Sequence, residues 1–345
     1  MTSYFSTFIS GFTDVIEQLV NRDFPDVKIT MLLDGLVVYS TEAPLQQVRK
    51  TRYFNNTFLL LNQFPITPPG RAEGIVRRLA SDVDFKTSLR PLMLARNSSF
   101  RLIVSRENQM ISVDKGIMRN IEARIISATR LRLGPLKADS EFWFLLRRED
   151  QAFLGVRLTG LNTVQKKPEK GEVSRELAYL LCSLSDPQDS DVFLDPFCGS
   201  GAIPLERAKS YPYSKIIAGD KDRGLVAALK QRAGIKDFEV ATLDATNLAS
   251  IADQSVDKVV TDPPWGLYDS SGNSTGGLEA LYDALLREFC RVIKPGGLVV
   301  ILTARKELLQ DLLKRKAVKK LLLQQTYDIL VSGKKAGVYV LKASA

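Results

Sequence analysis

The stretch DVFLDPFCGSGAIPLERA, residues 191–208, constrains the fold of this chain more than any other segment. An apolar run ends on the carboxylate of Asp195, and Gly199 and Gly201 follow before a helix-forming segment begins at Ala202. Glycine adopts positive φ and lets the backbone approach a ligand closely. A carboxylate at a strand end accepts hydrogen bonds from hydroxyl or ammonium groups. The stretch therefore predicts a strand, a tight turn and a helix around an adenosine-type cofactor.

Acidic residues end four successive apolar runs in this part of the chain: Asp195, Asp220, Asp244 and Asp262. Helical patterns separate the runs, and this alternation predicts a parallel sheet with helices on both faces. Because the carboxyl ends of parallel strands meet at one edge of a sheet, we expect the four acids to converge there. The final stretch, TYDILVSGKKAGVYVLKA, predicts an antiparallel hairpin at the sheet edge, with its turn at 332–336.

A dinucleotide cofactor is the competing interpretation of the glycine turn. Asp220 follows the first motif by about 25 residues, where the dinucleotide pattern has an acid for a ribose hydroxyl. The turn CGSGAI, however, lacks the GxGxxG pattern and fits a pyrophosphate poorly. A cofactor with one nucleoside and no phosphates fits better, and S-adenosylmethionine is such a cofactor.

The motif TDPPWG, residues 261–266, distinguishes between reaction types. Pro263 and Pro264 restrict the backbone directly after a strand, so the Asp262 carboxylate and the Pro263 carbonyl have fixed positions. Two fixed acceptors can hold the two hydrogens of an exocyclic amino group. Trp265 offers a flat apolar face on which a base can stack. The alternative, a proline turn beside a buried tryptophan, explains the motif in isolation but not its place after the glycine turn.

The N-terminal half carries nearly all of the excess positive charge. Residues 1–170 hold 25 Lys and Arg against 17 Asp and Glu, a net charge of +8, whereas the remainder holds 23 against 22, a net charge of +1. This asymmetry favours a polyanionic partner for the first half and chemistry in the second. The patterns predict two α+β units, over 4–64 and 99–160, and the polar stretch 161–172 predicts a linker.

Basic side chains recur through the second α+β unit. Individually they are typical of solvated surfaces, but together they predict a phosphate-binding surface. The candidate RNA-binding residues are Arg101, Arg106, Lys115, Arg119, Arg124, Arg147 and Arg148.

Composition excludes several classes of protein. The chain has no histidine, which excludes a Cys/His zinc site and histidine catalysis, and we expect no metal. The apolar runs are too short to span a membrane, and the N-terminus lacks the pattern of a signal peptide, so we expect a cytoplasmic protein without a membrane partner. Cys198 lies in the glycine turn, where we expect its small size to matter and not its reactivity.

At the level of motifs, the chain resembles class I S-adenosylmethionine-dependent amino-methyltransferases. DPFCGSGAIPLERA resembles their first motif, and TDPPWG resembles their (D/N)PP(Y/F/W) motif. More narrowly, the chain resembles the THUMP-domain RNA guanine-N2 methyltransferases, because FRLIVSRENQ, NIEARI and EFWFLLRREDQAFLGVRLTG look like the second half of a THUMP region. The resemblance covers nearly the whole chain and is weaker before Phe100.

This resemblance implies a fold and a domain order. It implies an α+β ferredoxin-like subdomain over 1–70 and a THUMP-like RNA-binding domain over 71–160. After the linker, it implies a Rossmann-like methyltransferase domain over 173–345, with a mostly parallel sheet and an antiparallel edge hairpin.

The resemblance also implies roles for individual residues. The cofactor-binding set is Asp195, Phe197, Gly199, Ser200, Gly201, Asp220, Lys221, Asp244 and Ala245. Asp262, Pro263, Pro264 and Trp265 form the catalytic set that holds the target guanine. The helix GEVSRELAYLL lacks the proline usual in this family, and Ser174 is the candidate there for the methionine carboxylate.

We therefore expect an enzyme that methylates the N2 amino group of a guanosine in RNA, with tRNA as the expected substrate. Ribosomal RNA, DNA adenine and protein glutamine remain alternative substrates, since each presents an amino nitrogen to the same motif. A THUMP-like RNA-binding protein that keeps its methyltransferase domain only as a scaffold is the alternative that is not an enzyme.

Overall fold

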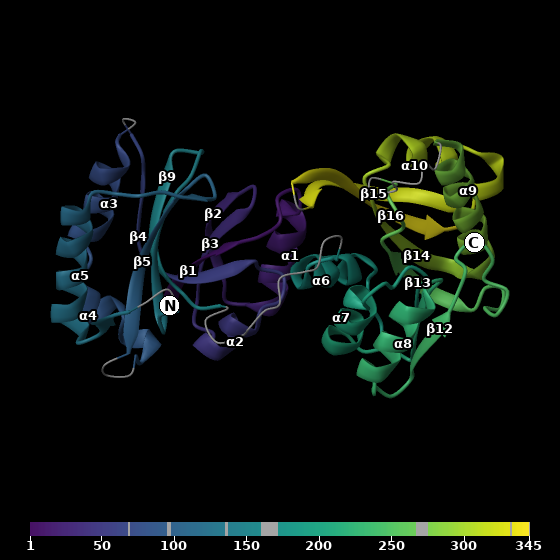
Figure 1. Ribbon diagram of the computed structural model, residues 1–345, viewed down its shortest axis with the longest axis horizontal. Helices are drawn as coiled ribbons and strands as arrows, with labels where there is room; N and C mark the ends of the chain where they lie inside the picture. The colour runs from purple at the N-terminus through teal and green to yellow at the C-terminus, as the bar shows by residue number, and fades with distance from the viewer. Residues whose placement is uncertain are drawn as a thin grey trace. The chain divides into compact units, whose positions relative to one another are not determined.

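The computed structural model describes residues 1–67, 70–94, 98–134, 137–159, 172–266, 275–331 and 333–344. The chain forms two compact units (Figure 1). The N-terminal unit comprises Met1–Phe8 and Thr13–Lys166, and the C-terminal unit comprises Ile9–Phe12 and Lys167–Ala345. Apart from Glu172, the predicted linker over 161–172 lies outside the described residues. None of the helices in the described part of the chain is long and apolar enough to cross a membrane.

A nine-stranded sheet forms the centre of the N-terminal unit. Its strands are β1 (Thr2–Thr7), β2 (Lys28–Leu33), β3 (Leu36–Thr41), β4 (Asn56–Pro65), β5 (Ser99–Arg106), β6 (Gln109–Met110), β7 (Arg132–Leu133), β8 (Ser140–Leu146) and β9 (Gln151–Arg157). They follow the order β2-β3-β1-β4-β9-β8-β5-β6, and β7 pairs with β5. The pairing of β4 with β9 places strands from both predicted α+β units in one sheet.

Short helices accompany this sheet. They are α1 (Thr13–Asp23), α2 (Leu45–Lys50), α3 (Ala72–Ser81), α4 (Phe85–Ser88), the 3-10 helix η1 (Arg90–Leu92) and α5 (Lys115–Thr129). The segments FTDVIEQLVNR, GIVRRLA and GIMRNIEARIISATR supply most of α1, α3 and α5. β8 and β9 form a hairpin around Glu149 and Asp150.

The two faces of this sheet pack differently. On one face, Phe85 of α4 lies edge-on to Phe142 of β8, with ring centroids 6.1 Å apart. On the other face, Phe5 of β1 stacks on Phe58 of β4 at 4.5 Å and also contacts Phe153 of β9. All five rings are buried, so the strands alternate side chains between two apolar layers.

A second sheet organises the C-terminal unit. Its strands are β10 (Val192–Asp195), β11 (Lys215–Asp220), β12 (Phe238–Thr242), β13 (Val256–Thr261), β14 (Ile293–Thr303), β15 (Leu321–Val331) and β16 (Lys334–Ala343). The order is β12-β11-β10-β13-β14-β16-β15. The first five strands are parallel, and β16 runs antiparallel to both β14 and β15. The predicted parallel sheet and antiparallel edge hairpin are therefore confirmed, although Ser332 in the hairpin turn lies outside the described residues.

Helices cover both faces of the second sheet (Figure 1). They are α6 (Arg175–Leu184), α7 (Ala202–Ser210), α8 (Arg223–Arg232), α9 (Thr275–Val292), α10 (Lys306–Leu313) and the 3-10 helix η2 (Lys316–Val318). Apolar residues of α9 and α10 pack on one face, where Phe289 and Leu309 join Val259 in a buried cluster. On the other face, Val226 of α8 packs with Ala218 of β11. The sheet therefore has the layered arrangement that places a ligand site at the carboxyl ends of its strands.

Close packing at Gly155 yields a stability prediction for the N-terminal unit. A Cβ atom at Gly155 would lie 2.5 Å from Cε1 of Phe5 and 2.7 Å from the carbonyl oxygen of Leu59. We expect Gly155→Ala to lower the free energy of unfolding by about 1–3 kcal/mol, since the backbone oxygen cannot move away cheaply. In the control, Gly74→Ala, the added Cβ meets nothing within 4 Å inside α3, so alanine should stabilise the helix by up to about 1 kcal/mol. Urea denaturation measures both changes, and equal effects at the two positions would contradict the packing.

Candidate active site

The carboxyl group of Asp195 lies at the end of β10 and is fully buried. Its Oδ1 accepts hydrogen bonds from Oγ1 of Thr261, at 2.8 Å, and from the backbone N of Phe197, at 3.2 Å. Its Oδ2 is also buried and has no hydrogen-bond partner among the described residues. Burial, together with the charges of Asp262 and Asp220, raises the pKa of Asp195 to about 8. An unpaired buried acceptor of this kind suits a cationic donor.

The glycine turn after β10 is held by the end of β11. The backbone N of Cys198 donates to the carbonyl oxygen of Gly219 at 2.8 Å, and the backbone N of Gly199 donates to Oδ2 of Asp220 at 2.9 Å. Gly199 and Gly201 have φ values of +50° and +90°, which side chains other than glycine rarely adopt. A Cβ at Gly199 would meet nothing within 4 Å, so open space lies beside the turn.

The next two predicted acids lie at neighbouring strand ends. The second oxygen of Asp220 accepts from the backbone N of Asp222 at 2.9 Å. Asp244 is exposed after β12, where hydrogen bonds from the hydroxyl and backbone N of Thr246 lower its pKa. Lys221 is exposed and Ala245 is buried. These residues follow the ends of the adjacent strands β11 and β12.

Two further predicted residues lie around the turn. Oγ of Ser200 donates to Oε1 of Glu172 at 2.6 Å, which brings the segment before α6 next to the glycine turn. Ser174 caps α6, and its Oγ accepts from the backbone N of Leu177 at 3.3 Å. The ring of Phe197 packs against the core under α9 and α10. Sequence reasoning missed Glu172, because its role depends on a contact 28 residues along the chain.

Residues 262–266 form an irregular segment after β13 that we call the acceptor loop. Protein atoms surround the Asp262 carboxyl although it keeps a small accessible surface, and this removal from water raises its pKa to about 7. Nε1 of Trp265 donates to Oδ1 of Asp262 at 2.8 Å. Oδ2 of Asp262 and the carbonyl oxygen of Pro263 accept no hydrogen bond from any residue that the structure describes. Trp265 therefore orients the Asp262 carboxyl, while Pro263 beside it is buried.

Three residues outside the motifs hold the acceptor loop. The hydroxyl of Tyr282 donates to the carbonyl oxygen of Pro264 at 3.2 Å, and Nε of Arg305 donates to the carbonyl oxygen of Trp265 at 2.6 Å. Thr303 bonds to Tyr282 at 2.7 Å. Sequence reasoning missed these residues, because their contacts cross 18 to 40 positions and leave no local pattern.

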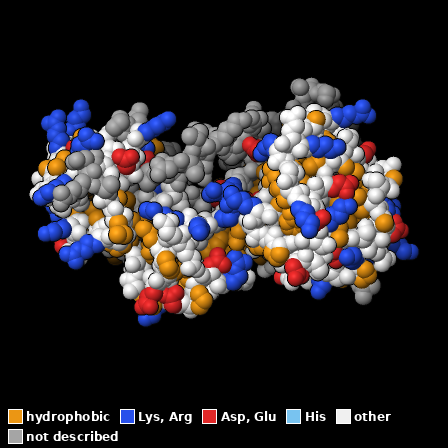
Figure 2. All heavy atoms as spheres, turned by 90° about the horizontal axis from the view of Figure 1, so that it is seen from below, with side chains coloured by type: hydrophobic (Ala, Val, Ile, Leu, Met, Phe, Trp, Pro, Cys, Tyr) orange, Lys and Arg blue, Asp and Glu red, His pale blue; other side chains and the backbone are white. Residues whose placement is uncertain are grey.

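The predicted RNA-binding residues fall into two groups. Arg101 pairs with Glu141, Arg124 donates to three carbonyl oxygens at residues 80–83, and Arg147 pairs with Glu149 and donates to the carbonyl oxygen of Asp34. These contacts hold the N-terminal unit together. The exposed group is Arg106, Lys115, Arg119 and Arg148. In this group, Nε of Arg148 forms an ion pair with Oε1 of Glu149 at 3.1 Å. Figure 2 shows Lys and Arg side chains on the surface of the N-terminal unit.

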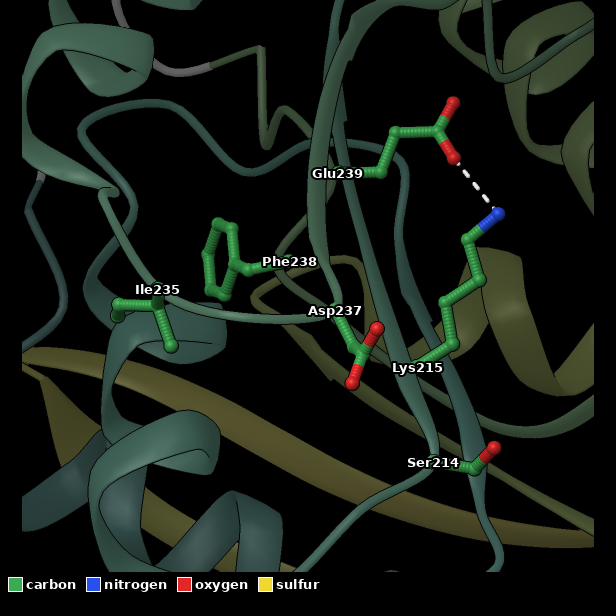
Figure 3. Close-up of a pocket in the computed structure, with 6 residues that line it drawn as sticks. All are labelled: Ser214, Lys215, Ile235, Asp237, Phe238 and Glu239. Carbon is green, nitrogen blue, oxygen red and sulfur yellow. Dashed lines mark ion pairs between the residues drawn. The ribbon is translucent and has the colours of Figure 1, made fainter.

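A surface pocket lies away from the carboxyl ends of the strands of the second sheet, where the candidate active site is. Its lining comes from the amino ends of β11 and β12 (Figure 3): Ser214, Lys215, Ile235, Asp237, Phe238 and Glu239. The two long charged side chains in it, Lys215 and Glu239, pair with each other at 2.7 Å. Because ligands in such sheets bind at the carboxyl ends of the strands, this pocket is not the candidate active site.

Cys198 is a poor candidate for a nucleophile. Burial and the charges of Asp195 and Asp220 raise the pKa of its thiol, so the thiol stays protonated at neutral pH. This agrees with its interpretation as a small residue inside the turn.

The sheet order, the edge hairpin and the acidic strand ends together define a class I methyltransferase fold. Residues 164–328 match the family model described as "UPF0020: RMKL-like, methyltransferase domain". Most of the matched stretch lies in the C-terminal unit, which is therefore similar to this family of methyltransferase domains.

Comparisons with individual proteins extend this result. The chain is 35% identical over 170 residues to a tRNA (guanine(6)-N2)-methyltransferase from Thermus thermophilus, covering 47% of this chain and 50% of that one. It is 23% identical over 364 residues to a protein of the same name from Methanocaldococcus jannaschii, covering 89% and 92%. The crystal structure of TrmN from Thermus thermophilus superposes with a TM-score of 0.78 at 24% identity, covering 99% of this chain and 100% of that one. The whole chain therefore has the fold of that protein.

The extent of these matches differs between relatives. The matched stretches span 50%, 28% and 52% of the three curated relatives that rank first. The chain thus spans about half or less of their length at this level of identity.

The buried carboxyl of Asp195 leads to a prediction about stability and pH. The folded protein keeps a proton on Asp195 up to a pH of about 8, whereas the unfolded chain loses it near 3.8, so stability falls as pH rises between these values. Asp195→Asn removes this effect because the amide does not ionise. We expect its melting temperature to exceed that of the wild type by several degrees at about pH 8.5, and the difference to shrink toward acidic pH.

The control is Asp189→Asn, which changes an exposed carboxylate in the same unit. Differential scanning calorimetry from about pH 5 to pH 9 measures both variants. A difference between Asp195→Asn and the wild type that does not change with pH would contradict the protonated state of the buried carboxyl.

Proposed function

We propose that this protein transfers a methyl group from S-adenosylmethionine to the exocyclic N2 amino group of a guanosine in RNA, with tRNA as the expected substrate. The observation that carries the proposal is a pair of oxygens in the acceptor loop that accept no hydrogen bond from the described residues. Oδ2 of Asp262 and the carbonyl oxygen of Pro263 stand on neighbouring residues while Trp265 fixes the other carboxylate oxygen. An amino group carries two hydrogens that such a pair can accept.

The residues around the glycine turn fit the proposed cofactor. The partnerless Oδ2 of Asp195 suits the ammonium group of a methionine moiety, and the open space beside Gly199 lets a ligand approach the backbone. Asp220 and Asp244 offer acceptors for ribose and adenine groups at the next two strand ends. When bound, the cofactor supplies a methyl group already activated by a sulfonium.

Asp262 has the properties of a proton acceptor for the amino nitrogen. Its carboxylate accepts a hydrogen bond from the amino group and takes up the proton that the nitrogen loses when its new bond to carbon forms. A pKa of about 7 favours this uptake near neutral pH, since a proton acceptor is most effective when its pKa lies near the working pH. Trp265 limits the rotation of the carboxylate and presents an indole face for the base.

Relatives support guanosine in tRNA as the substrate. The two relatives described above are named tRNA (guanine(6)-N2)-methyltransferases, and the Methanocaldococcus protein matches along most of this chain. We extend this substrate to the present chain because its acceptor loop has the chemistry for an exocyclic amino group. Ribosomal RNA, DNA adenine and protein glutamine are the substrates that the product analysis must distinguish.

The N-terminal unit has features that support RNA binding. We propose that residues 1–70 act as the ferredoxin-like part and 71–160 as the THUMP-like part of an RNA-binding region. Lys115 and Arg119 lie one turn apart on α5, are exposed and form no ion pair with a described residue. Such side chains contact phosphates without reading sequence. The three free cysteines support a reducing compartment, and we propose the cytoplasm.

The acceptor loop yields the main test of the proposed chemistry. Asp262→Ala should lower methyl transfer to RNA by about 100-fold or more. It removes the carboxylate that accepts a hydrogen bond from the amino group and takes up its proton. Cofactor affinity, measured by calorimetry, should stay within about threefold, since Asp262 is not among the residues proposed to hold the cofactor.

The pH dependence of transfer provides the control. The single-turnover rate of the wild type should rise with pH through about 7, as Asp262 loses its proton. Asp262→Asn keeps the shape of the side chain and should remove this step. Transfer by Asp262→Ala within a few fold of the wild type would overturn the assignment.

The basic helix α5 leads to a prediction about RNA affinity. The double variant Lys115→Ala/Arg119→Ala should weaken RNA binding and reduce the slope of log K against log salt by about two, because each phosphate contact contributes about one. Fluorescence anisotropy with labelled tRNA at several salt concentrations measures both quantities. Lys230→Ala/Lys236→Ala, which removes two exposed charges from the C-terminal unit, serves as the charge-matched control. An unchanged slope in the α5 variant would refute this role.

A further inference from the structure

We infer that Tyr282 and Thr303 are positioning residues for methyl transfer, which act by fixing the acceptor loop through the carbonyl oxygen of Pro264. The inference rests on the proposed function, because it assigns these residues to the group that holds the substrate amine. Neither residue belongs to a motif in the sequence, and Arg305 completes the arrangement.

The acceptor loop itself contains few groups that can hold it in place. Pro263 and Pro264 have no backbone N–H, so these positions cannot donate hydrogen bonds to the surrounding protein. The loop is attached instead through its carbonyl oxygens. Pro264 accepts from the hydroxyl of Tyr282 at 3.2 Å, and Trp265 accepts from Nε of Arg305 at 2.6 Å.

The hydrogen-bond donors form one directed chain. The backbone N of Arg305 donates to Oγ1 of Thr303 at 2.9 Å. The single hydroxyl hydrogen of Tyr282 goes to Pro264, so in the 2.7 Å bond between the two hydroxyls Thr303 is the donor. The chain therefore runs from Arg305 through Thr303 and Tyr282 to Pro264. Burial raises the pKa of Tyr282, which keeps its hydroxyl protonated as this chain requires.

Both hydroxyl residues belong to rigid parts of the C-terminal unit. The side chains of Tyr282 and Thr303 are fully buried, and the Tyr282 ring packs in the core cluster with residues of α9 and the sheet. Thr303 is the last residue of β14, the strand that pairs with β13 directly before the loop. The loop is thus fixed to a helix and to a neighbouring strand end.

These attachments select which acceptors remain for the substrate. Two successive carbonyl oxygens, of Pro264 and Trp265, are occupied, and the carbonyl oxygen of Pro263 is left without a partner from the described residues. Fixing the two residues that follow Pro263 limits rotation of its peptide plane. Misplacement of a reacting group by about 1 Å can slow a reaction about 100-fold. Loss of one of the hydrogen bonds that fix the acceptor loop should therefore lower kcat.

Kinetics of three matched variants test the inference. Tyr282→Phe and Thr303→Val each remove one hydroxyl and keep most of the buried volume. Tyr339→Phe is the control, because it removes a buried tyrosine hydroxyl whose contact is Nε2 of Gln310 at 3.4 Å, away from the loop. We expect kcat to fall about 10-fold in the first two variants, with KM for RNA and the cofactor Kd unchanged. The control should keep the kcat of the wild type.

The double variant separates positioning from general destabilisation. If both hydroxyls act through one chain, Tyr282→Phe/Thr303→Val should lose little more kcat than the more damaging single variant. The inference would be overturned if both single variants kept the kcat of the wild type. It would also be overturned if kcat fell only in proportion to melting temperature and fell in Tyr339→Phe as well.

A second measurement does not depend on activity. The chain has two tryptophans, so Trp143→Phe leaves Trp265 as the single fluorescent indole and reports on the loop. On this background, Tyr282→Phe should raise the acrylamide quenching constant of Trp265 about twofold, and Tyr339→Phe should not. If the wild type methylates a different amino group, the kcat ratios still apply to that group. If it transfers no methyl group, the proposed function fails and unchanged quenching would then reject the loop role on its own.

Discussion

The hydrogen bond from Thr261 to Asp195 joins the carboxyl ends of β13 and β10, and the site depends on it. It satisfies one oxygen of a fully buried carboxyl and leaves the other oxygen without a partner among the described residues. A buried carboxylate in that position is unstable without a compensating donor, which is why the pKa of Asp195 is raised to about 8. Up to about pH 8 a proton neutralises this acid, and a cationic ligand could take the place of that proton.

The two loops that follow these strands divide the chemistry between them. The turn at Gly199 lies after β10 and is bound to Asp220 of the neighbouring strand. The acceptor loop lies after β13, on the other side of β10 in the sheet order. Because both strands end at the same edge, the proposed methyl donor and the proposed methyl acceptor meet there without contributions from distant parts of the sheet.

Much of this arrangement could be predicted from the sequence, for identifiable reasons. Strands ending on Asp195 and Asp220 are apolar runs bounded by glycine or acid, so local patterns define them. The position of Asp262 and Pro263 directly after β13 follows from the short motif and its prolines. The nine-stranded sheet was not predicted, because the pairing of β4 with β9 joins residues about 100 positions apart. Arg124 is a second case in which a long-range contact could not be predicted. The sequence around it is typical of an exposed arginine, yet its guanidinium donates to carbonyl oxygens at the end of α3.

Identification of the methylated nucleoside tests the central claim most directly. The protein is incubated with total RNA and S-adenosylmethionine that carries a trideuterated methyl group, and the RNA is digested to nucleosides for mass spectrometry. The account predicts the label in N2-methylguanosine from the tRNA fraction. Label in methyladenosine, label only in the ribosomal RNA fraction, or no label in any guanosine would contradict it.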